Sequence, residues 1–489
     1  MTHITAPAAP SPTSEAFLSE AAALLGPRGL TTDPDRMDVW LTDWRGRYTG
    51  RALALASPAT TAEVAALVRL CAAHGVPIVP QGGNSGMAGG ATPDASGSAL
   101  LLSLRRMDAI RALDTEARQV LCEAGVILQH LHEAAEGAGM RFPLTLGGKG
   151  SATIGGLVST NAGGTQVLRH GTMRAQVLGL EAVLASGDVL DTLTPLKKDN
   201  RGFDLKQLLI GSEGTLGIVT AATLRLLPAP IGRATAWVGL GGIIEARTLL
   251  RQMERALGDA LEGFEVVPAH CLDSVLAHLP VARAPLAERH EWNALIECVS
   301  ATRDSSALRE AMEAGLAAAL DNGLIADAVI AANDTQAEDF WTLRDSISAA
   351  ERAIGPAMQH DISVPVEKMP EFILAASPAI EAAFPGTRAA AFGHLGDGNV
   401  HFHVLAPPGA ERGVWEEADG KAVSAAVHDL VSQWGGSISA EHGIGQMKVD
   451  ELARLHDPAA LALMQLIKGA LDPDNLLNPG KLLHVAPRS

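Results

Sequence analysis

Three glycine-rich segments constrain this chain more than any other feature of its sequence; they span residues 81–90, 146–164 and 210–220. Glycine lets backbone N–H groups approach phosphate oxygens without obstruction from a side chain. Three such segments in one region favour a long, anionic ligand with several groups, although glycines that serve only tight turns are the alternative. Neither the G-x-G-x-x-G nor the G-x-x-x-x-G-K-[ST] pattern occurs, which disfavours the common nicotinamide and P-loop sites.

Length, charge and cysteine content further limit the class of protein to which this chain can belong. The 489 residues suffice for two to four domains of about 100–200 residues each. A net charge of −17 argues against a nucleic-acid partner, and the absence of a long apolar run predicts no transmembrane segment. The N-terminal residues lack the features of a secretory or organelle-targeting segment. The four cysteines form no C-x-x-C pair, so we expect no iron–sulfur cluster within the chain, a reducing compartment and a cytoplasmic protein.

The coarse secondary-structure pattern indicates an α+β protein. Between residues 53 and 137, short apolar strands alternate with helices, and the first of these helices is expected to start at Thr60 or Thr61 and to end at Gly75. After a proline-containing stretch near 228–232, strands alternate with alanine-rich helices, which predicts a domain boundary there. A further long helix is predicted for 412–434.

Histidines are concentrated between residues 394 and 403, where His394, His401 and His403 occur within ten positions. In a strand, His401 and His403 face the same side, and the intervening turn sequence can fold His394 back beside His401. Glu441 follows a segment of small residues further along the chain. Two imidazoles and one carboxylate form a three-ligand site with an open position, which is typical of a catalytic metal. Unrelated polar strand residues are the alternative.

The glycine segments and the histidine segment together resemble one known family. Pro80–Gly86, Gly147–Gly156, Thr160–Gly164 and Ser212–Thr220 are similar to the FAD-binding half of the vanillyl-alcohol oxidase / p-cresol methylhydroxylase superfamily. The C-terminal motifs narrow the resemblance to the FAD-linked D-2-hydroxyacid dehydrogenases, which include D-lactate, D-2-hydroxyglutarate and glycolate enzymes. The resemblance covers about residues 40–485.

The resemblance implies a particular α+β architecture. It consists of a two-part FAD-binding domain of the p-cresol methylhydroxylase type, an α+β substrate-capping domain and a C-terminal closing helical segment. We accordingly expect an N-terminal segment at 1–44, the FAD-binding domain at 45–230, the capping domain with a metal site at 231–445, and a segment returning to the FAD domain at 446–489.

The resemblance also implies FAD held by the backbone of the glycine segments. No His or Cys stands in 81–90, so noncovalent FAD is expected, while His170 is either a packing histidine or a flavin link. The residues expected to line the cofactor are Gln81, Gly82, Gly83, Asn84, Ser85, Gly86, Gly147, Gly148, Ser151, Gly155, Gly156, Asn161, Gly163, Gly164, Glu213, Gly214, Gly217 and Ile218.

The family motifs assign the metal and the base by resemblance. His394 and His401 of H-L-G-D-G-N-x-H and Glu441 of E-H-G-x-G match the ligands of a divalent metal. Zinc suits this ligand set, with manganese or cobalt as alternatives. His442 matches the histidine that acts as the active-site base.

A helix motif implies which residues bind the substrate, and one nearby residue departs from the family pattern. Arg344 of W-x-x-R-x-x-I-[ST] matches the residue that holds the substrate carboxylate. This role suits its planar guanidinium group, which can donate two parallel hydrogen bonds to a carboxylate. Ser348 is expected one helical turn later on the same face, and His403 stands at a substrate-side position. Gln359 occupies a place where relatives often have Lys, which weakens the expectation of a second substrate carboxylate there.

The implied reaction is the FAD-dependent, metal-assisted oxidation of a D-2-hydroxy acid (D-2-hydroxyglutarate, D-lactate or similar) to the 2-oxo acid. The hydride passes to flavin N5, and a separate acceptor, an electron-transfer flavoprotein or a quinone-linked partner, takes the electrons. The partners considered are this small-molecule substrate, the acceptor and a second copy in a homodimer, with no nucleic acid. The alternatives are a FAD oxidase of the same superfamily on another alcohol, or the flavin subunit of a multi-subunit glycolate oxidase complex. Tyr48 is the only tyrosine, which argues against phenol oxidation.

Overall fold

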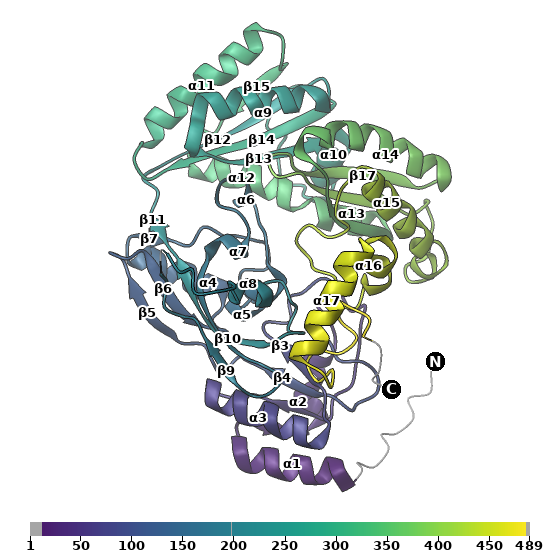
Figure 1. The fold of residues 1–489 in the computed structure, drawn as a ribbon. Coiled ribbons are helices and arrows are strands. Elements are labelled where there is room, and N and C mark those ends of the chain that lie inside the picture. The colour runs from purple at the N-terminus through teal and green to yellow at the C-terminus, as the bar shows by residue number, and fades with distance from the viewer. Residues whose placement is uncertain (1–11, 197, 486–489) are drawn as a thin grey trace.

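The computed structural model describes residues 12–196 and 198–485, which form a lower part, an upper part and a C-terminal stretch that runs back from the upper part to the lower (Figure 1). The predicted α+β class is confirmed, and the two parts have separate sheets. None of the helices in the described ranges has the length and apolar character needed to cross a bilayer. The chain leaves the lower part after β11 (Leu227–Pro228); the exact division at residues 44, 230 and 445 stays a prediction.

A four-stranded sheet opens the lower part and delivers the first glycine-rich segment. Helix α3 (Thr61–His74) precedes β3; Thr60 accepts the N–H of Glu63 at its start, and Gly75 ends it at φ 65°, as predicted. Gln81 is the last residue of β3, so the glycines that follow lie at the carboxyl end of a parallel strand, a common ligand position. The sheet order is β1 (Leu30–Thr31), β2 (Ala54–Ala56), β4 (Leu100–Ser103) and β3 (Ile78–Gln81), and β2 and β3 run parallel to β4.

A five-stranded antiparallel sheet completes the lower part and holds the other two glycine-rich segments. Its central strand β10 (Ile218–Arg225) begins where the third segment ends, and seven of its eight residues are buried. Helix α5 (Ile154–Thr160), which contains part of the second segment, packs against this strand. The sheet order is β5 (Ile110–Asp114), β6 (Gln119–Glu123), β10, β8 (Val177–Val183) and β9 (Val189–Asp191); β7 (Met140–Arg141) pairs separately with β11.

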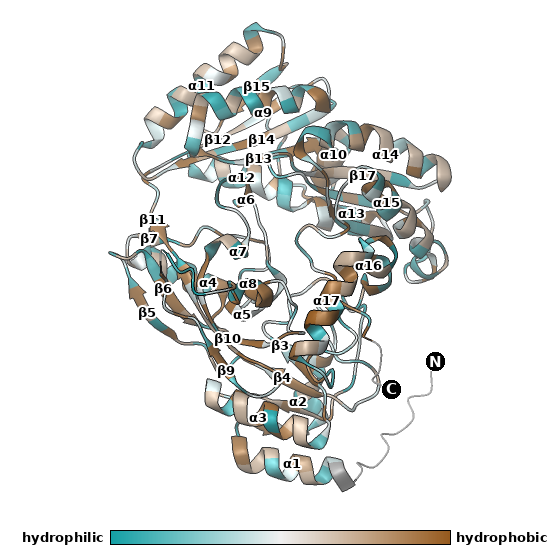
Figure 2. Cartoon of the chain, viewed as in Figure 1, coloured by the Kyte–Doolittle hydropathy of each residue, from teal (hydrophilic) through white to brown (hydrophobic). Residues whose placement is uncertain are grey.

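The upper part is built on one seven-stranded antiparallel sheet with apolar clusters on both faces. Trp237 and Phe392 belong to one cluster, and Val238 and Phe402 belong to the other, as the alternation of side chains along a strand requires. The hydrophobic colouring of these strands is evident in Figure 2. The order is β15 (Asp327–Ile330), β12 (Gly232–Leu240), β14 (Trp292–Ser300), β13 (Leu261–Pro268), β17 (Arg388–His394), β18 (Asn399–Leu405) and β16 (Ala357–Ser363).

Helices cover both parts, and one of them differs from its prediction. The helix predicted for 412–434 is confirmed over most of its length, because helical backbone runs from residue 414 to 433; it differs in a π-helical stretch at 416–420 before α15, and in Gly413, which adopts φ 85° in the preceding turn. The remaining helices are α1 (Pro12–Leu25), α2 (Pro34–Leu41), α4 (Leu128–Gly137), α6 (Val167–His170), α7 (Met173–Gln176), α8 (Lys206–Leu209), α9 (Ile243–Leu257), α10 (Ala269–His278), α11 (Ser305–Asp321), α12 (Asp334–Asp345), α13 (Ile347–Ile354), α14 (Met369–Ala383), α15 (Lys421–Gln433), α16 (Val449–Leu455) and α17 (Pro458–Leu471).

Buried polar contacts fasten the C-terminal stretch to the lower part. Lys468 of α17 is buried and donates a hydrogen bond to the carbonyl oxygen of Thr215 at 2.8 Å. The amide of Asn478 donates to the carbonyl oxygen of Glu213 at 2.7 Å, and the Glu213 carboxylate accepts the N–H groups of residues 444 and 445, each at 2.7 Å. The third glycine-rich segment is therefore completed by residues that lie more than 200 positions later in the chain.

A buried ionic cluster joins the upper and lower parts on the opposite side. The Glu262 carboxylate of β13 pairs with Arg141 at 2.6 Å, Arg169 at 2.9 Å and His170 at 3.4 Å. Burial opposes ionisation, but hydrogen bonds from His170 and Arg141 lower the pKa of Glu262 to about 2. His170, considered above as a flavin link, thus lies in this cluster and is not among the residues that line the cavity described below.

We expect Glu262→Gln to lower the free energy of unfolding by about 3 kcal/mol, because it leaves buried cations without their carboxylate. The folded pKa lies below the unfolded value of 4.5, so the stabilisation is complete above pH 4.5 and is lost as the pH falls toward 2. Urea unfolding of both proteins at pH 7 and pH 3 measures the effect. Glu254→Gln, in an exposed pair with Arg251, is the control and should cost less than about 1 kcal/mol; an equal loss in both variants would contradict the prediction.

Candidate active site

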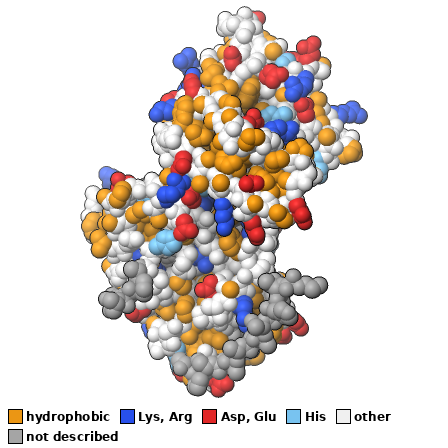
Figure 3. All heavy atoms as spheres, turned by 90° about the vertical axis from the view of Figure 1, so that its right-hand side faces the viewer, with side chains coloured by type: hydrophobic (Ala, Val, Ile, Leu, Met, Phe, Trp, Pro, Cys, Tyr) orange, Lys and Arg blue, Asp and Glu red, His pale blue; other side chains and the backbone are white. Residues whose placement is uncertain are grey.

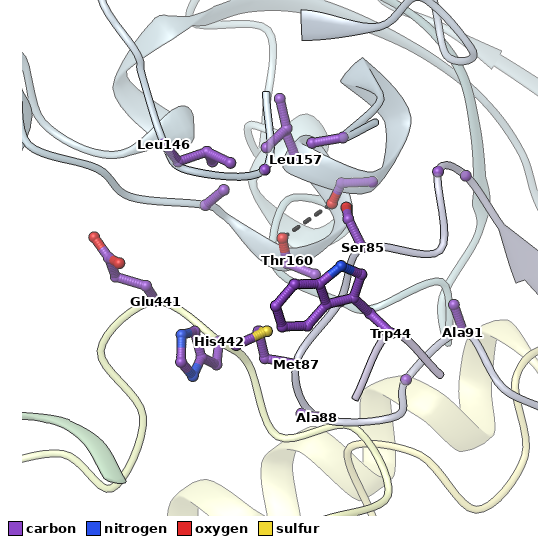
Figure 4. Close-up of a pocket in the computed structure, with 18 of the residues that line it drawn as sticks. Trp44, Ser85, Met87, Ala88, Ala91, Leu146, Leu157, Thr160, Glu441 and His442 are labelled. Carbon is purple, nitrogen blue, oxygen red and sulfur yellow. Dashed lines mark hydrogen bonds between the residues drawn. The ribbon is translucent and has the colours of Figure 1, made fainter. Parts of the chain in front are cut away.

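A cavity of about 690 Å³ lies between the glycine-rich segments of the lower part and the β16–β18 region of the upper part. The lower part contributes its glycine loops together with Trp44 and Met87, and the loop after α15 contributes Glu441 and His442 (Figure 4). Figure 3 shows acidic and basic side chains close together at the level where the two parts meet. The cavity thus brings together segments that are up to 400 residues apart.

Most of the predicted FAD-lining residues line this cavity, and two do not. Asn161 ends α5 at φ 50° and its side-chain oxygen accepts the N–H of Arg174, while a Cβ at Gly164 would lie 2.1 Å from the carbonyl oxygen of Thr145. Both residues shape the loop around the cavity. Those that line it are Gln81, Gly82, Gly83, Asn84, Ser85, Gly86, Gly147, Gly148, Ser151, Gly155, Gly156, Gly163, Glu213, Gly214, Gly217 and Ile218.

The walls of this region suit a large, anionic cofactor. A Cβ built on Gly86, Gly147 or Gly150 meets no atom within 4 Å, so these glycines leave open space at the cavity wall. At Gly83 a Cβ would lie 1.6 Å from the carbonyl oxygen of Ser151, so only glycine lets the first two segments touch. The glycines therefore serve both purposes weighed above, as close loop contacts and as bare backbone facing a ligand.

The β17–β18 hairpin brings two of the predicted metal ligands together. His394 pairs with Asn399 across the hairpin, and the ring centroids of His394 and His401 are 5.4 Å apart. Burial opposes a charge on His394, but the Glu265 carboxylate, which lies 2.5 Å from Nδ1, raises the pKa of this imidazole to about 9. Nε2 of each imidazole lies 3.2 Å from Nη2 of Arg344. Burial and the charge of Arg344 hold the pKa of His401 well below its usual value, so this imidazole is neutral.

The third predicted ligand, Glu441, lines the same cavity. Burial and the nearby charge of Asp361 raise the pKa of Glu441 to about 7. Two imidazole nitrogens and this carboxylate match the chemistry of a divalent-metal site. Within the described ranges, however, no group of three His, Cys, Asp or Glu side chains is close enough to hold a metal ion, and Nη2 of Arg344 lies between the two imidazoles.

Asp361, on β16, positions the loop that carries Glu441 and His442. Its Oδ2 accepts the backbone N–H groups of Glu441 at 2.8 Å and His442 at 2.9 Å, and its Oδ1 accepts the amide of Asn399 at 2.8 Å. Burial opposes the charge of Asp361, but His442, His401 and these N–H groups hold its pKa below the usual range. Burial lowers the pKa of His442 to about 4, so the imidazole is neutral at pH 7 and can accept a proton.

The predicted substrate residues Arg344 and Ser348 also line the cavity, but they do not share a helix. Helix α12 ends at Asp345 and α13 begins at Ile347, because Ser346 closes the first helix as its C-cap. Ser346 keeps a right-handed helical conformation, and both side chains line the same cavity, so the role expected for Ser348 beside Arg344 stays a prediction. The Arg344 Nε atom donates to Glu265 at 2.9 Å, which fixes the guanidinium in the buried site.

His403 lies beside the other histidines on β18 and also lines the cavity. Its Nδ1 is 2.5 Å from the carboxylate of the buried Glu351, so this ring is anchored from behind. The sequence interpretation missed Asp361 and the lining residues Trp44, Arg45 and Arg352. The alternation Gln359-His-Asp361 in a strand was a usable signal for Asp361, whereas nothing in the local sequence marks Arg45.

Comparisons with known proteins agree with this geometry. Residues 52–193 match the family described as FAD binding domain, and residues 230–482 match FAD linked oxidases, C-terminal domain. A "Probable D-2-hydroxyglutarate dehydrogenase, mitochondrial" from Oryza sativa subsp. indica is 38% identical over 463 residues, 94% of this chain and 80% of the rice protein. A D-2-hydroxyglutarate dehydrogenase from Xanthomonas citri pv. viticola is 37% identical over 468 residues, 94% of this chain and 95% of the relative.

The chain belongs to the FAD-linked D-2-hydroxyacid dehydrogenase family.

The solved structures confirm the fold-level expectation for this FAD-linked dehydrogenase. p-Cresol methylhydroxylase with substrate bound has a TM-score of 0.71 and 16% identity, covering 96% of this chain and 97% of that one. An alkyldihydroxyacetonephosphate synthase has a TM-score of 0.73 and 16% identity, covering 97% of this chain and 87% of that one. The predicted enzyme class, a FAD-dependent oxidoreductase, is confirmed as well.

The prediction of a cytoplasmic protein is wrong by the same comparisons. Relatives from Oryza sativa, Arabidopsis thaliana and Bos taurus are named mitochondrial, while the bacterial relative from Xanthomonas citri carries no such term. The cysteines indicate only whether the compartment is reducing. The N-terminal composition indicates only whether a recognised targeting signal is present. Neither feature distinguishes a cytoplasmic from a mitochondrial protein here.

Proposed function

We propose that this dehydrogenase oxidises a D-2-hydroxy acid, foremost D-2-hydroxyglutarate with D-lactate as a further candidate, to the 2-oxo acid. The observation that carries the proposal is that Arg344 and the neutral His442 face the same cavity as the glycine-rich FAD segments. A carboxylate-binding cation and a proton acceptor beside a flavin are the groups that this oxidation requires. The names of the curated relatives favour the five-carbon diacid among the candidates.

Different residues bind the substrate carboxylate and accept the hydroxyl proton. Arg344, held by Glu265, binds the C1 carboxylate of the substrate through its terminal nitrogens. His442, held by the loop anchored on Asp361, accepts the proton of the 2-hydroxyl group. FAD, when bound, supplies the acceptor for the hydride from C2. The glycine segments and Trp44 surround this point, which limits the access of water.

We further propose a divalent metal at His394, His401 and Glu441, zinc by its ligand types, with manganese or cobalt as alternatives. Glu441 lines the cavity near the carboxylates of Asp361 and Asp397, whose negative charges a bound cation would offset. Held by these residues, a metal would supply a Lewis acid that lowers the pKa of the substrate hydroxyl group. Glu265 holds His394 by its Nδ1, as an outer-shell partner of a metal-binding histidine does.

The electrons of the reduced flavin require an acceptor outside this chain. None of the four cysteines forms a C-x-x-C pair that could begin an iron–sulfur relay. We propose a separate protein acceptor, an electron-transfer flavoprotein or a quinone-linked partner. A dye acceptor replaces that partner in an assay.

The purified protein tests the activity directly. It is expected to be yellow, with flavin absorption and about one FAD per chain, and to reduce a dye with D-2-hydroxyglutarate but not with its L enantiomer. A folded, colourless protein, or a yellow protein that is inactive on a panel of D-2-hydroxy acids, would contradict the proposed function.

Metal content tests the second proposal separately from turnover. We expect elemental analysis to find about one divalent metal per wild-type chain and little in His394→Ala, with the FAD absorption unchanged. His484→Ala, a change of an exposed histidine, is the control and should keep the metal. Wild-type protein that is free of metal yet fully active would rule out the metal site.

A further inference from the structure

Arg45 places a second cation in the cavity, away from Arg344. It lies on the short loop between Thr42 and Thr49, which pair across the base of that loop, and it lines the cavity. Its Nη1 donates a hydrogen bond to Oε1 of Gln359, a residue 314 positions later. Burial and the charges of Arg47 and Arg352 lower the pKa of Arg45 to about 10, so it remains a cation at pH 7.

The Gln359 side chain presents a donor with no acceptor. Its Nε2 is buried and has no hydrogen-bond partner within the part of the chain that the structure describes. Because Oε1 of Gln359 accepts the hydrogen bond from Arg45, the Nε2 atom of the same side chain points away from that bond. A buried donor that lines a cavity and lacks a partner costs about 1–3 kcal/mol unless a ligand supplies an acceptor.

Arg352 adds a further positive charge at this end of the cavity. It follows Ser348 by four residues on α13, so the two side chains share one helix face, and both line the cavity. Arg45 and Arg352 are close enough for each charge to affect the other. Asp43, the carboxylate nearest to Arg45 in sequence, already accepts the N–H of Tyr48 at 2.7 Å. This end of the cavity therefore offers two guanidinium groups and an amide donor to an anion.

The strand register sets the spacing between the two cationic ends. Gln359 pairs with His403, and Asp361 pairs with His401. Gln359 therefore lies two residues along β16 from Asp361, the residue that faces His401. Two residues along a strand span about 7 Å, and their side chains share a face. A chain of four carbon–carbon bonds of about 1.5 Å each, as in a five-carbon diacid, has a comparable reach.

We propose that Arg45, together with the Nε2 amide of Gln359, binds a second carboxylate of the substrate, so that the site selects dicarboxylic over monocarboxylic 2-hydroxy acids. The inference rests on the proposed function and specifies its substrate class. It also reverses the expectation drawn from Gln359 alone, because the cation absent at that position is supplied by a residue from the N-terminal region. Arg352 contributes charge to the same end.

The test compares two substrates that differ in the second carboxylate, D-2-hydroxyglutarate and D-lactate, in dye-linked assays. Arg45→Gln is expected to lower the ratio of kcat/KM for the diacid to kcat/KM for the monoacid at least tenfold, through a higher KM for the diacid. Arg289→Gln removes an exposed arginine that pairs with Asp273 and does not line the cavity, and it should leave the ratio unchanged. Arg45→Lys should keep part of the preference, and Gln359→Lys in the Arg45→Gln background should restore it.

The outcomes separate this inference from the proposed function. An equal loss of kcat/KM for both acids in Arg45→Gln, or loss of FAD absorption from that variant, would overturn the second-carboxylate site while leaving the dehydrogenase activity standing. A wild-type protein that prefers D-lactate would overturn it too. Inactivity of the yellow wild-type protein on every D-2-hydroxy acid would instead overturn the proposed function, on which this inference rests.

Discussion

Replacing Arg344 by glutamine is expected to lower kcat/KM for the D-2-hydroxy acid about a hundred- to a thousandfold. The guanidinium is held by Glu265 at 2.9 Å and faces the cavity, so it offers the substrate carboxylate a positioned, charge-assisted contact. Truncating one partner of a buried charge pair costs about 2–5 kcal/mol, and each 1.4 kcal/mol is a factor of ten in rate or affinity. Steady-state kinetics with a dye acceptor measure the loss, most of which should appear in KM.

Two further variants show whether the loss reports substrate binding. Arg344→Lys keeps the charge but not the planar fork and should recover only part of the activity. Arg289→Gln changes an exposed arginine that pairs with Asp273 and should behave as wild type. FAD absorption is expected to remain in all three proteins. An Arg344→Gln protein with wild-type KM and kcat would show that this residue does not bind the substrate.

Asp361→Asn is expected to lower kcat about a hundredfold while KM changes little. Asp361 lines the cavity, but its carboxylate is engaged by the protein, because one oxygen holds the backbone N–H groups of Glu441 and His442. An amide nitrogen at that oxygen would face two donors, so the loop that carries the base must move, and a shift of about 1 Å can cost a hundredfold in rate. Asp361 is thus a positioning residue.

The split between kcat and KM distinguishes this role from a general loss of folding. The melting temperature of Asp361→Asn should fall, because a buried carboxylate with a lowered pKa stabilises the fold, but the protein should remain folded and keep its FAD absorption at the assay temperature. Asp273→Asn, an exposed aspartate in a surface pair, is the control and should show no change in kcat. If kcat were unchanged in folded, yellow Asp361→Asn protein, the loop would not depend on this carboxylate.

The features predicted well from sequence are those that depend on neighbouring residues. The α3 helix begins and ends as its Thr60 cap and Gly75 predict, because capping involves bonds within one turn. The proximity of His394 and His401 follows from a hairpin with a glycine-containing turn and strict side-chain alternation. The glycine segments line the cavity because their composition directly permits a close approach of the backbone.

The features that sequence did not predict depend on contacts between distant segments or on small energetic differences. Arg45 reaches Gln359 across 314 residues, and Asp361 reaches Glu441 across 80, so no local pattern marks either one. Helix α12, which carries Arg344, ends at Asp345 and α13 begins two residues later at Ile347, a break that no local sequence pattern marks. Helix ends and loop placements are where tertiary structure decides the outcome.

The attachment of the C-terminal stretch also determines when the active site can form during biosynthesis. The Glu213 carboxylate is bound by backbone groups of residues 444 and 445, and Asn478 reaches the same glycine segment. A ribosome adds residues one by one, so for more than half of translation the emerging lower part lacks the partners that close its third glycine loop. Cofactor capture is therefore expected late, after the final helices have left the exit tunnel, and apo chains bearing an open flavin cleft are the species that cellular quality control would meet first.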